Sequence, residues 1–189
     1  MVPVVLASGS PRRREMLERL GVDFDVVIPD VDETPLAGED PSAYVERLAR
    51  SKAAAVPAAP GSLVIAADTT VDVDGEILGK PVDADDARRM LRRLSGRAHY
   101  VHSGVAVRLG DRMESGVDET RVVLEPIPDH ALDWYVATGE PLDKAGAYAL
   151  QGVGAVFVAR VAGSVSTVIG LPLTLLVDLC RRLGIDLVG

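Results

Sequence analysis

The sequence predicts a mixed α/β fold, because stretches with strand periodicity and stretches with helical periodicity alternate along its 189 residues. Short hairpin turns join some of the strands, which adds antiparallel pairs to the sheet. No internal repeat, low-complexity segment or linker rich in Gly, Ser or Pro divides the chain. We therefore expect a single domain over residues 1–189. Apolar residues make up 48% of the chain, which is enough to build a core.

The first three elements lead from a strand into a helix and back to a strand. Residues 2–7 (VPVVLA) have the continuous apolar character of a buried strand. Ser10 is expected to cap a helix that has Pro11 at its first position, and Gly21 ends this helix. Residues 24–29 (FDVVIP) form a second strand, and an acidic loop follows it.

The next helix and strand each carry one charged residue in an apolar setting. The helix begins at Asp40 and Pro41 and continues to about Val56. The strand at 63–67 (LVIAA) is too continuously apolar to lie at the surface, and it ends at Asp68. The inward face of the helix, spaced by three and four residues, carries Val45, Leu48, Ala49 and Lys52.

The rest of the chain continues this alternation. Asp74 and Gly75 form the centre of a hairpin over residues 70–78, and the acids that start the next helix suit its dipole. The further elements expected are a helix at 83–94, strands at 100–109 and 120–126, a helix at 128–137, a glycine-rich loop at 139–154, a strand at 156–161 and a helix at 171–183.

The balance of charge argues against a polynucleotide partner. Lys and Arg number 20 against 28 Asp and Glu, and the formal net charge of −8 disfavours a polymer held by broad phosphate neutralisation. Seven acids and no base lie between Asp23 and Asp40, whereas residues 11–20 contain four arginines against two glutamates. A local basic patch on an acidic protein suits a small anion.

Neither the cysteine content nor the hydropathy pattern is typical of an exported or membrane protein. Cys180 is the single cysteine and is expected to be a buried thiol, which favours a reducing compartment. No basic segment precedes the apolar run at 2–7, unlike in a secretory signal. The charge-free stretch at 161–177 is shorter than the roughly 20 apolar residues of a membrane span. We expect a soluble cytoplasmic protein without a membrane partner.

Two features suggest where a small anion binds. The turn at 6–17 (LASGSPRRREML) joins a strand to a helix N-terminus, where backbone N–H groups and the dipole favour an anion. The positive charges of Arg12 and Arg13 are unfavourable at the positive end of this dipole unless an anion binds there. The alternative is an ordinary capped helix with solvated arginines. The chain has 17 arginines but three lysines, and either a shared anionic ligand or a composition bias would explain the placement of Lys52, Lys80 and Lys144.

Two carboxylates near these basic groups suggest metal-assisted phosphate chemistry. Asp68 follows a buried strand, where open α/β sheets bind ligands, although a cap or turn residue would occupy the same place. Glu33, in the acidic loop, supplies a second carboxylate, and magnesium binds in this way to one or two protein oxygens and phosphates. Zinc is not expected, because His99 and His102 are three residues apart in a strand and His130 has no partner nearby.

Ordered motifs over nearly the whole chain resemble those of one enzyme family. They are LASGSPRRREML (6–17), VDETP (31–35), YVERLARSKA (44–53), AADTTV (66–71), LGKPVDADDA (78–87), MLRRLSGRAH (90–99), GEPLDKAGAYALQGVGAVFV (139–158) and VIGLPL (168–173). With these motifs in this order, the sequence is similar to the Maf family of nucleoside triphosphate pyrophosphatases, once described as septum formation inhibitors.

The resemblance implies hydrolysis between the α and β phosphates of a nucleoside triphosphate, with a divalent cation, Mg or Mn, as cofactor. It implies a two-lobed α/β fold with an elongated mixed sheet flanked by helices, a central nucleotide cleft and commonly a homodimer. By position, Asp68 matches the family's proton acceptor and a metal ligand, and Glu33 matches a metal-site carboxylate. The positions that match substrate contacts of the family are Ser8, Arg13, Lys52 and Lys80.

Three positions that separate the branches of the family concern the base of the substrate. They are Arg12, Thr69 and Gln151 here, and they resemble the branch that acts on dTTP and UTP. The branch that acts on 7-methyl-GTP has a tryptophan, a glutamine and a glutamate at these places. A pyrophosphatase of that other branch, or a septum-formation regulator that binds nucleotide without turnover, is the alternative function.

Overall fold

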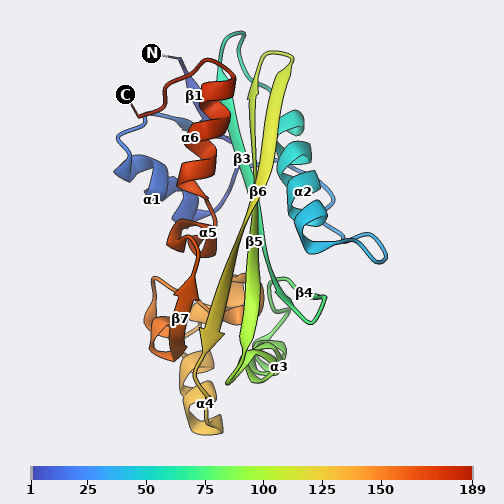
Figure 1. The fold of residues 1–189 in the computed structure, drawn as a ribbon, viewed down its shortest axis with the longest axis vertical. Coiled ribbons are helices and arrows are strands. Elements are labelled where there is room, and N and C mark those ends of the chain that lie inside the picture. The colour runs from blue at the N-terminus through green and yellow to red at the C-terminus, as the bar shows by residue number, and fades with distance from the viewer. Residues whose placement is uncertain (1, 189) are drawn as a thin grey trace. The chain divides into compact units, whose positions relative to one another are not determined.

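The computed structural model describes residues 2–188 and shows the mixed α/β fold that the sequence predicts (Figure 1). Within these residues one sheet has the strand order β2-β1-β3-β5-β6-β7, and β4 pairs with β3. The strands are β1 (Val4–Leu6), β2 (Asp25–Val26), β3 (Leu63–Val73), β4 (Glu76–Leu78), β5 (Ala98–Leu109), β6 (Arg112–Leu124) and β7 (Val158–Ala162). The helices are α1 (Pro11–Arg19), α2 (Pro41–Ala55), α3 (Ala84–Leu94), α4 (Asp129–Ala137), α5 (Val165–Ile169) and α6 (Leu173–Arg182).

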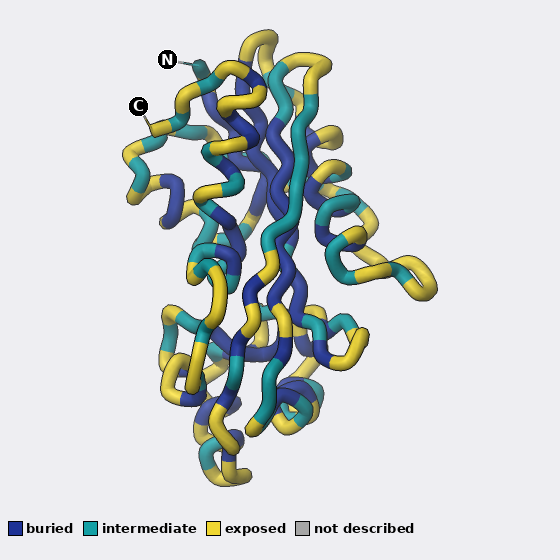
Figure 2. Tube along the Cα trace, in the orientation of Figure 1, coloured by how far each residue is buried: buried dark blue, intermediate teal, exposed yellow. Residues whose placement is uncertain are grey.

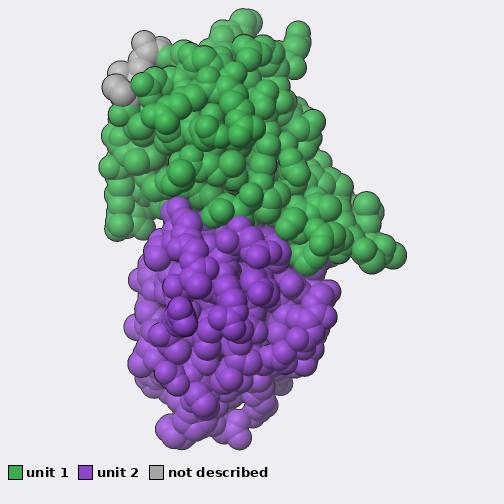
Figure 3. Space-filling model, viewed as in Figure 1, with its two compact units in different colours: residues 1–68, 103–118, 170–189 green, residues 69–102, 119–169 purple. Residues whose placement is uncertain are grey.

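The chain forms two compact units (Figure 3). Unit 1 comprises residues 1–68, 103–118 and 170–189, and unit 2 comprises residues 69–102 and 119–169. The residues of β3, β5 and β6 are divided between the two units. Figure 2 shows that β3 and β5 are buried along most of their length. A single domain over the whole chain stays a prediction.

Unit 1 is built on parallel strands and on a helix that approaches them closely. Strand β1 pairs in parallel with β2 and β3, so Val5 lies opposite both Asp25 and Val64. A Cβ at Gly104 of β5 would lie 2.4 Å from the carbonyl oxygen of Val45 in α2, so a larger residue would push the helix away. Small side chains dominate the adjoining core, which comprises Val5, Ala7, Ala49, Ala53, Val56, Val64, Ala66 and Ala106.

Unit 2 contains the predicted hairpin and the helix that follows it. Strands β3 and β4 pair in antiparallel fashion around Asp74 and Gly75, whose positive φ angles of 55° and 79° are those that a two-residue hairpin turn requires. Helix α3 is capped by Asp83, whose carboxylate accepts a hydrogen bond from the backbone N–H of Asp86. The hairpin prediction is therefore confirmed, and the acids that start α3 stabilise its first turn.

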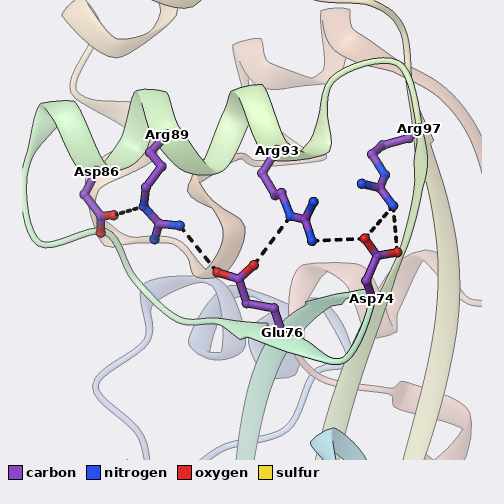
Figure 4. A network of polar contacts seen from close by, with 6 residues as sticks. All are labelled: Asp74, Glu76, Asp86, Arg89, Arg93 and Arg97. Atoms are coloured by element: carbon purple, nitrogen blue, oxygen red, sulfur yellow. Dashed lines mark hydrogen bonds and ion pairs between the residues drawn. The ribbon is translucent and has the colours of Figure 1, made fainter.

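A chain of ion pairs joins this hairpin to α3 (Figure 4). Arg97 contacts Asp74 at 2.7 Å, and Arg93 contacts both Asp74 at 3.0 Å and Glu76 at 3.4 Å. Arg89 continues the chain to Glu76 and Asp86. Hydrogen bonding to Arg97 holds the pKa of Asp74 below its usual value. Each exposed pair contributes little by itself, but together they restrict how the hairpin can move relative to α3.

Several predicted boundaries differ from the structure. Strand β3 does not end before Asp68 but continues through it to Val73, so Asp68 lies within a strand and is neither a cap nor a turn residue. The strand expected at 24–29 is limited to β2, and α5 was not predicted. Ser10 is the N-cap residue of α1, but its side chain makes no capping hydrogen bond. Three short 3₁₀ helices occupy the predicted loop, η1 (Glu140–Asp143), η2 (Ala145–Ala147) and η3 (Val153–Phe157).

Two expectations about the apolar parts of the chain concern Cys180 and the membrane. Cys180 is a buried free thiol, as predicted, and burial raises its pKa to about 11. In the part of the chain that the structure describes, no helix has both the length and the apolar character needed to cross a membrane.

A buried histidine in unit 2 is expected to make stability depend on pH. His99 is 1% exposed, and its Nε2 lies 2.8 Å from the hydroxyl of Tyr148. Burial lowers the pKa of His99 from 6.5 to about 4, and the charge of Arg97 adds to this. Below pH 6.5 the unfolded chain therefore binds a proton that the folded chain does not. The contribution of neutral, buried His99 to the free energy of unfolding is therefore complete above pH 6.5. It is lost progressively as the pH falls to about 4.

We expect the free energy of unfolding to fall by about 3 kcal/mol over this window because of His99 alone. Urea unfolding at several pH values between 7.5 and 4.5 measures it. His99→Gln should flatten the pH dependence, since a glutamine does not titrate. His130→Gln, on the exposed side of α4, controls for the loss of a histidine elsewhere. Parallel pH curves for the parent and His99→Gln would contradict the prediction.

Candidate active site

Unit 1 brings three of the predicted charged residues together, with two carboxylates beside the ammonium group of a lysine. Lys52 Nζ lies 2.6 Å from Asp68 Oδ1 and 2.7 Å from Glu33 Oε1. The side chains of Lys52 and Asp68 are 8% and 10% exposed, whereas that of Glu33 is 55% exposed. Lys52 thus neutralises a buried carboxylate and holds a solvent-accessible one beside it.

The structure of α2 explains how a lysine reaches this buried place. Lys52 follows Val45 by seven residues, so it lies on the inward face of the helix. Asp40 caps the N-terminus of the helix by accepting hydrogen bonds from two backbone N–H groups. At the other end, Arg108 donates hydrogen bonds to the carbonyl oxygens of Ala53 at 2.9 Å and Val56 at 2.6 Å. Both ends of the helix that carries Lys52 are therefore held.

Two side chains of α2 hold the acidic loop that carries Glu33. The hydroxyl of Tyr44 donates to the carbonyl oxygen of Glu33 at 2.9 Å. Arg47 binds both carboxylate oxygens of Glu39, at 2.6 and 2.7 Å, and also contacts the carbonyl oxygen of Thr34. The hydrogen bond from Arg47 lowers the pKa of Glu39 to about 2. These contacts fix the backbone of the loop at several points.

The electrostatics of Tyr44 also place it beside the charged group. Burial raises the pKa of Tyr44 to about 12, and the negative charges of Asp68 and Glu33 contribute to the shift. The hydroxyl therefore remains protonated and can donate to the loop at any physiological pH. The sequence does not predict this role of Tyr44, although an aromatic residue at the edge of the apolar stripe of α2 is an available signal.

Arg13 and Ser8 form a second basic part of the site in unit 1. Arg13 Nε donates to the carbonyl oxygen of Gly170 at 2.8 Å, and its Nη1 lies 3.2 Å from Ser8 Oγ. Ser8 Oγ also accepts from the backbone N–H of Ser10, so the turn before α1 is ordered by its own side chain. Burial lowers the pKa of Arg13, against the opposing effects of Asp68 and Glu33. This guanidinium therefore lies within electrostatic reach of both carboxylates.

The other predicted site residues have different surroundings. Arg12 is half-buried in the first turn of α1, and its charge contributes to the lowered pKa of Arg13. Thr69, Lys80 and Gln151 belong to unit 2, where Thr69 is half-buried and the other two are exposed.

The lysines of unit 2 are placed by the loop at 139–154. The N–H of Gly146 donates to the carbonyl oxygen of Gly79 at 3.1 Å, which ties this loop to the residue before Lys80. Lys144 Nζ binds the carbonyl oxygen of Glu140 at 2.7 Å and Asp143 Oδ1 at 2.5 Å. Lys144 thus binds groups of its own loop, whereas Lys80 is exposed.

The donor set of unit 1 fits a hard divalent cation. Among residues 2–188 there is no group of three or more His, Cys, Asp or Glu arranged to hold a metal. However, Asp68 Oδ1 and Glu33 Oε1 both lie within 2.7 Å of the Lys52 ammonium nitrogen, so two carboxylates face one point of positive charge. Magnesium commonly takes one or two protein carboxylates and completes its shell with water and phosphate oxygens.

Comparison with known proteins extends over nearly the whole chain. A dTTP/UTP pyrophosphatase of Anaeromyxobacter dehalogenans (strain 2CP-C) is 56% identical over 189 residues, which cover 97% of this chain and 95% of the relative. A dTTP/UTP pyrophosphatase of Myxococcus xanthus (strain DK1622) is 54% identical and covers 97% and 94%. The structure of the Staphylococcus aureus Ham1 protein aligns with a TM-score of 0.45 and 19% identity over 67% of this chain and 72% of its own. Residues 3–183 match the family described as Maf-like protein, and the chain therefore belongs to the Maf family.

Proposed function

We propose that this chain is a nucleoside triphosphate pyrophosphatase that converts dTTP and UTP to the nucleoside monophosphate and pyrophosphate. The names of relatives that are 56% and 54% identical over 97% of the chain support this function. The structural observation that carries it is Lys52, which lies between the carboxylates of Asp68 and Glu33. This arrangement combines a proton acceptor, a second acid and a cation for phosphate in one place.

In this reaction a water oxygen attacks the α phosphorus, and the bond from that phosphorus to the oxygen that bridges to the β phosphorus breaks. Asp68 accepts the proton of the water, and pyrophosphate leaves with the bridging oxygen. Lys52 and Arg13 offset negative charge on the phosphate oxygens. Because the ammonium group of Lys52 contacts Asp68 without substrate, its movement towards a phosphate would free the carboxylate to act as the base.

Glu33 and Asp68 would hold a divalent cation, Mg or Mn, which when bound would neutralise charge on the phosphate oxygens. Tyr44 and Arg47 keep the loop of Glu33 in place for this purpose. Lys80, exposed after β4, is a further ammonium group suited to a phosphate. A homodimer and a cytoplasmic location are further parts of the proposal, and both rest on the family resemblance.

In the proposed enzyme, the base of the nucleotide is recognised by Arg12, Thr69 and Gln151. The guanidinium of Arg12 and the amide of Gln151 offer donors to pyrimidine carbonyl oxygens, and the amide oxygen can accept from the ring N3–H. The short side chain of Thr69 leaves space. A methylated guanine is larger and cationic, so it would meet the positive charge of Arg12 where an aromatic ring would favour it.

A substrate panel tests this function. At fixed magnesium concentration, kcat/KM should be far higher for dTTP and UTP than for 7-methyl-GTP, because unpaired donors in a site built for hydrogen bonding penalise the wrong base. The panel also includes CTP and GTP. A value for 7-methyl-GTP equal to that for dTTP would overturn the base preference but not the pyrophosphatase. Stoichiometric nucleotide binding without monophosphate formation would overturn the enzyme itself and favour a regulator.

A further inference from the structure

The turn that carries Gln151 is held by one carboxylate in unit 2. Glu140 Oε1 accepts hydrogen bonds from the hydroxyl of Tyr135 at 2.8 Å and from the N–H of Gly154 at 2.9 Å. Its Oε2 accepts from the N–H of Val153 at 3.0 Å. A single side chain thus receives three donors, two of them from the backbone two and three residues after Gln151.

Tyr135 connects the same carboxylate to the other end of the turn. Its ring is fully buried in α4, and its hydroxyl accepts from the N–H of Ala149 at 3.1 Å while donating to Glu140. Ala149 precedes Gln151 by two residues and Val153 follows it by two. The pair of Tyr135 and Glu140 therefore ties both ends of a five-residue turn, while Gln151 at its centre remains exposed.

The glycines of this turn are needed where these two side chains approach. A Cβ at Gly152 would lie 2.2 Å from Glu140 Oε2, and a Cβ at Gly154 would lie 2.4 Å from the hydroxyl of Tyr135. Any larger residue would displace the carboxylate or the phenol. The backbone next to Gln151 is thus shaped to accept the contacts of Glu140.

The charges of the network are consistent with this arrangement. Partial burial would raise the pKa of Glu140, but hydrogen bonds from Gly154, Tyr135 and Val153 outweigh it, and the pKa is lowered. Burial raises the pKa of Tyr135, and its hydrogen bond to Glu140 adds to the shift. An ionised acceptor therefore faces a neutral donor, the combination that gives strong hydrogen bonds.

We propose that Glu140 and Tyr135 are positioning residues that orient Gln151 towards the base of the substrate. The inference rests on the proposed function, in which Gln151 reads a pyrimidine. Neither residue touches the substrate; they determine where the amide of Gln151 is presented. Recognition of the base, and not of the phosphates, should depend on them.

Glu140→Gln tests the proposal with little change in the shape of the side chain. It disrupts the hydrogen bonds, because one acceptor oxygen becomes an NH₂ group that faces hydrogen-bond donors. The KM for dTTP should rise about 10-fold or more, since small misplacement of a contact is enough for such losses. Inhibition by inorganic pyrophosphate, which has no base, should stay within about twofold of the parent, a pattern that general loss of structure would not produce. Asp143→Asn, an acid of the same loop that pairs with Lys144, is the matched control and should leave both constants unchanged.

Tyr135→Phe serves as a second variant, because it removes the hydrogen bond from Ala149 and the hydrogen bond to Glu140 but keeps the two backbone contacts of Glu140. Gln151→Ala tests recognition of the base by Gln151 separately from the positioning of Gln151 by Glu140 and Tyr135. If Gln151→Ala lowers the preference for dTTP and UTP but Glu140→Gln and Tyr135→Phe do not, the positioning role is overturned and the proposed function stands. If Gln151→Ala has no effect on base preference, both the positioning role and the proposed reading of the base are overturned. Equal losses for dTTP and pyrophosphate would overturn the positioning role alone.

Discussion

Replacement of Asp68 by Asn should lower the kcat/KM for dTTP by at least about 100-fold, because general base catalysis supplies roughly 10² to 10⁴ in rate. The amide keeps the shape of the side chain but cannot take up the proton of the attacking water. The folded state should persist, because Lys52 keeps Glu33 as a partner at 2.7 Å. The release of pyrophosphate, followed at fixed magnesium and dTTP concentrations, gives the rate.

Asp72→Asn is a suitable control for this experiment. Asp72 lies in the same strand, four residues along, and is only partly exposed, but it is not among the groups that contact Lys52. Its replacement should leave turnover close to that of the parent. Activity of Asp68→Asn within about threefold of the parent, with an unchanged melting temperature, would show that another group accepts the proton.

The positions of Lys52 and Asp68 show what the sequence predicts and where it stops. Helical spacing from Val45 places Lys52 on the inward face of α2, and this prediction is confirmed. The predicted end of the strand at Asp68 is wrong. That prediction rests on the rule that a charged residue after an apolar run usually marks the end of a buried strand. The ion pair with Lys52 removes that restriction, so β3 continues through Asp68. A pairing between residues 16 positions apart on two elements depends on tertiary packing, which spacing alone does not contain.

Unit 2 shows the same division between local and tertiary information. Asp74 and Gly75 predict their hairpin, because the turn depends only on the conformations that these two residues adopt. The contacts of Glu140 were not predicted, since they require a buried phenol from α4 and short 3₁₀ turns that have no clear periodicity. Helix α5 has five residues and is also too short for a periodic signal.

Replacement of Lys52 by Met should lower the free energy of unfolding by about 3 kcal/mol, because it leaves the carboxylate of Asp68 buried without a counter-charge. Methionine matches the apolar stem of lysine, so loss of packing contributes little. Glu33 is 55% exposed and can regain water, so Asp68, at 10%, accounts for most of the loss. Urea denaturation of parent and variant at pH 7.5, with the slope checked for constancy, measures the difference.

The double variant Lys52→Met with Asp68→Asn shows whether an unpaired charge is the cause. A neutral amide needs no counter-ion, so the double variant should be more stable than Lys52→Met alone, although it lacks two native side chains. The coupling between the two substitutions should exceed about 1 kcal/mol, as for residues in direct contact. Additive losses would mean that Asp68 is adequately solvated without Lys52. In that case Lys52 would not be needed to neutralise Asp68, and the buried ammonium group would be retained for the phosphates of the substrate.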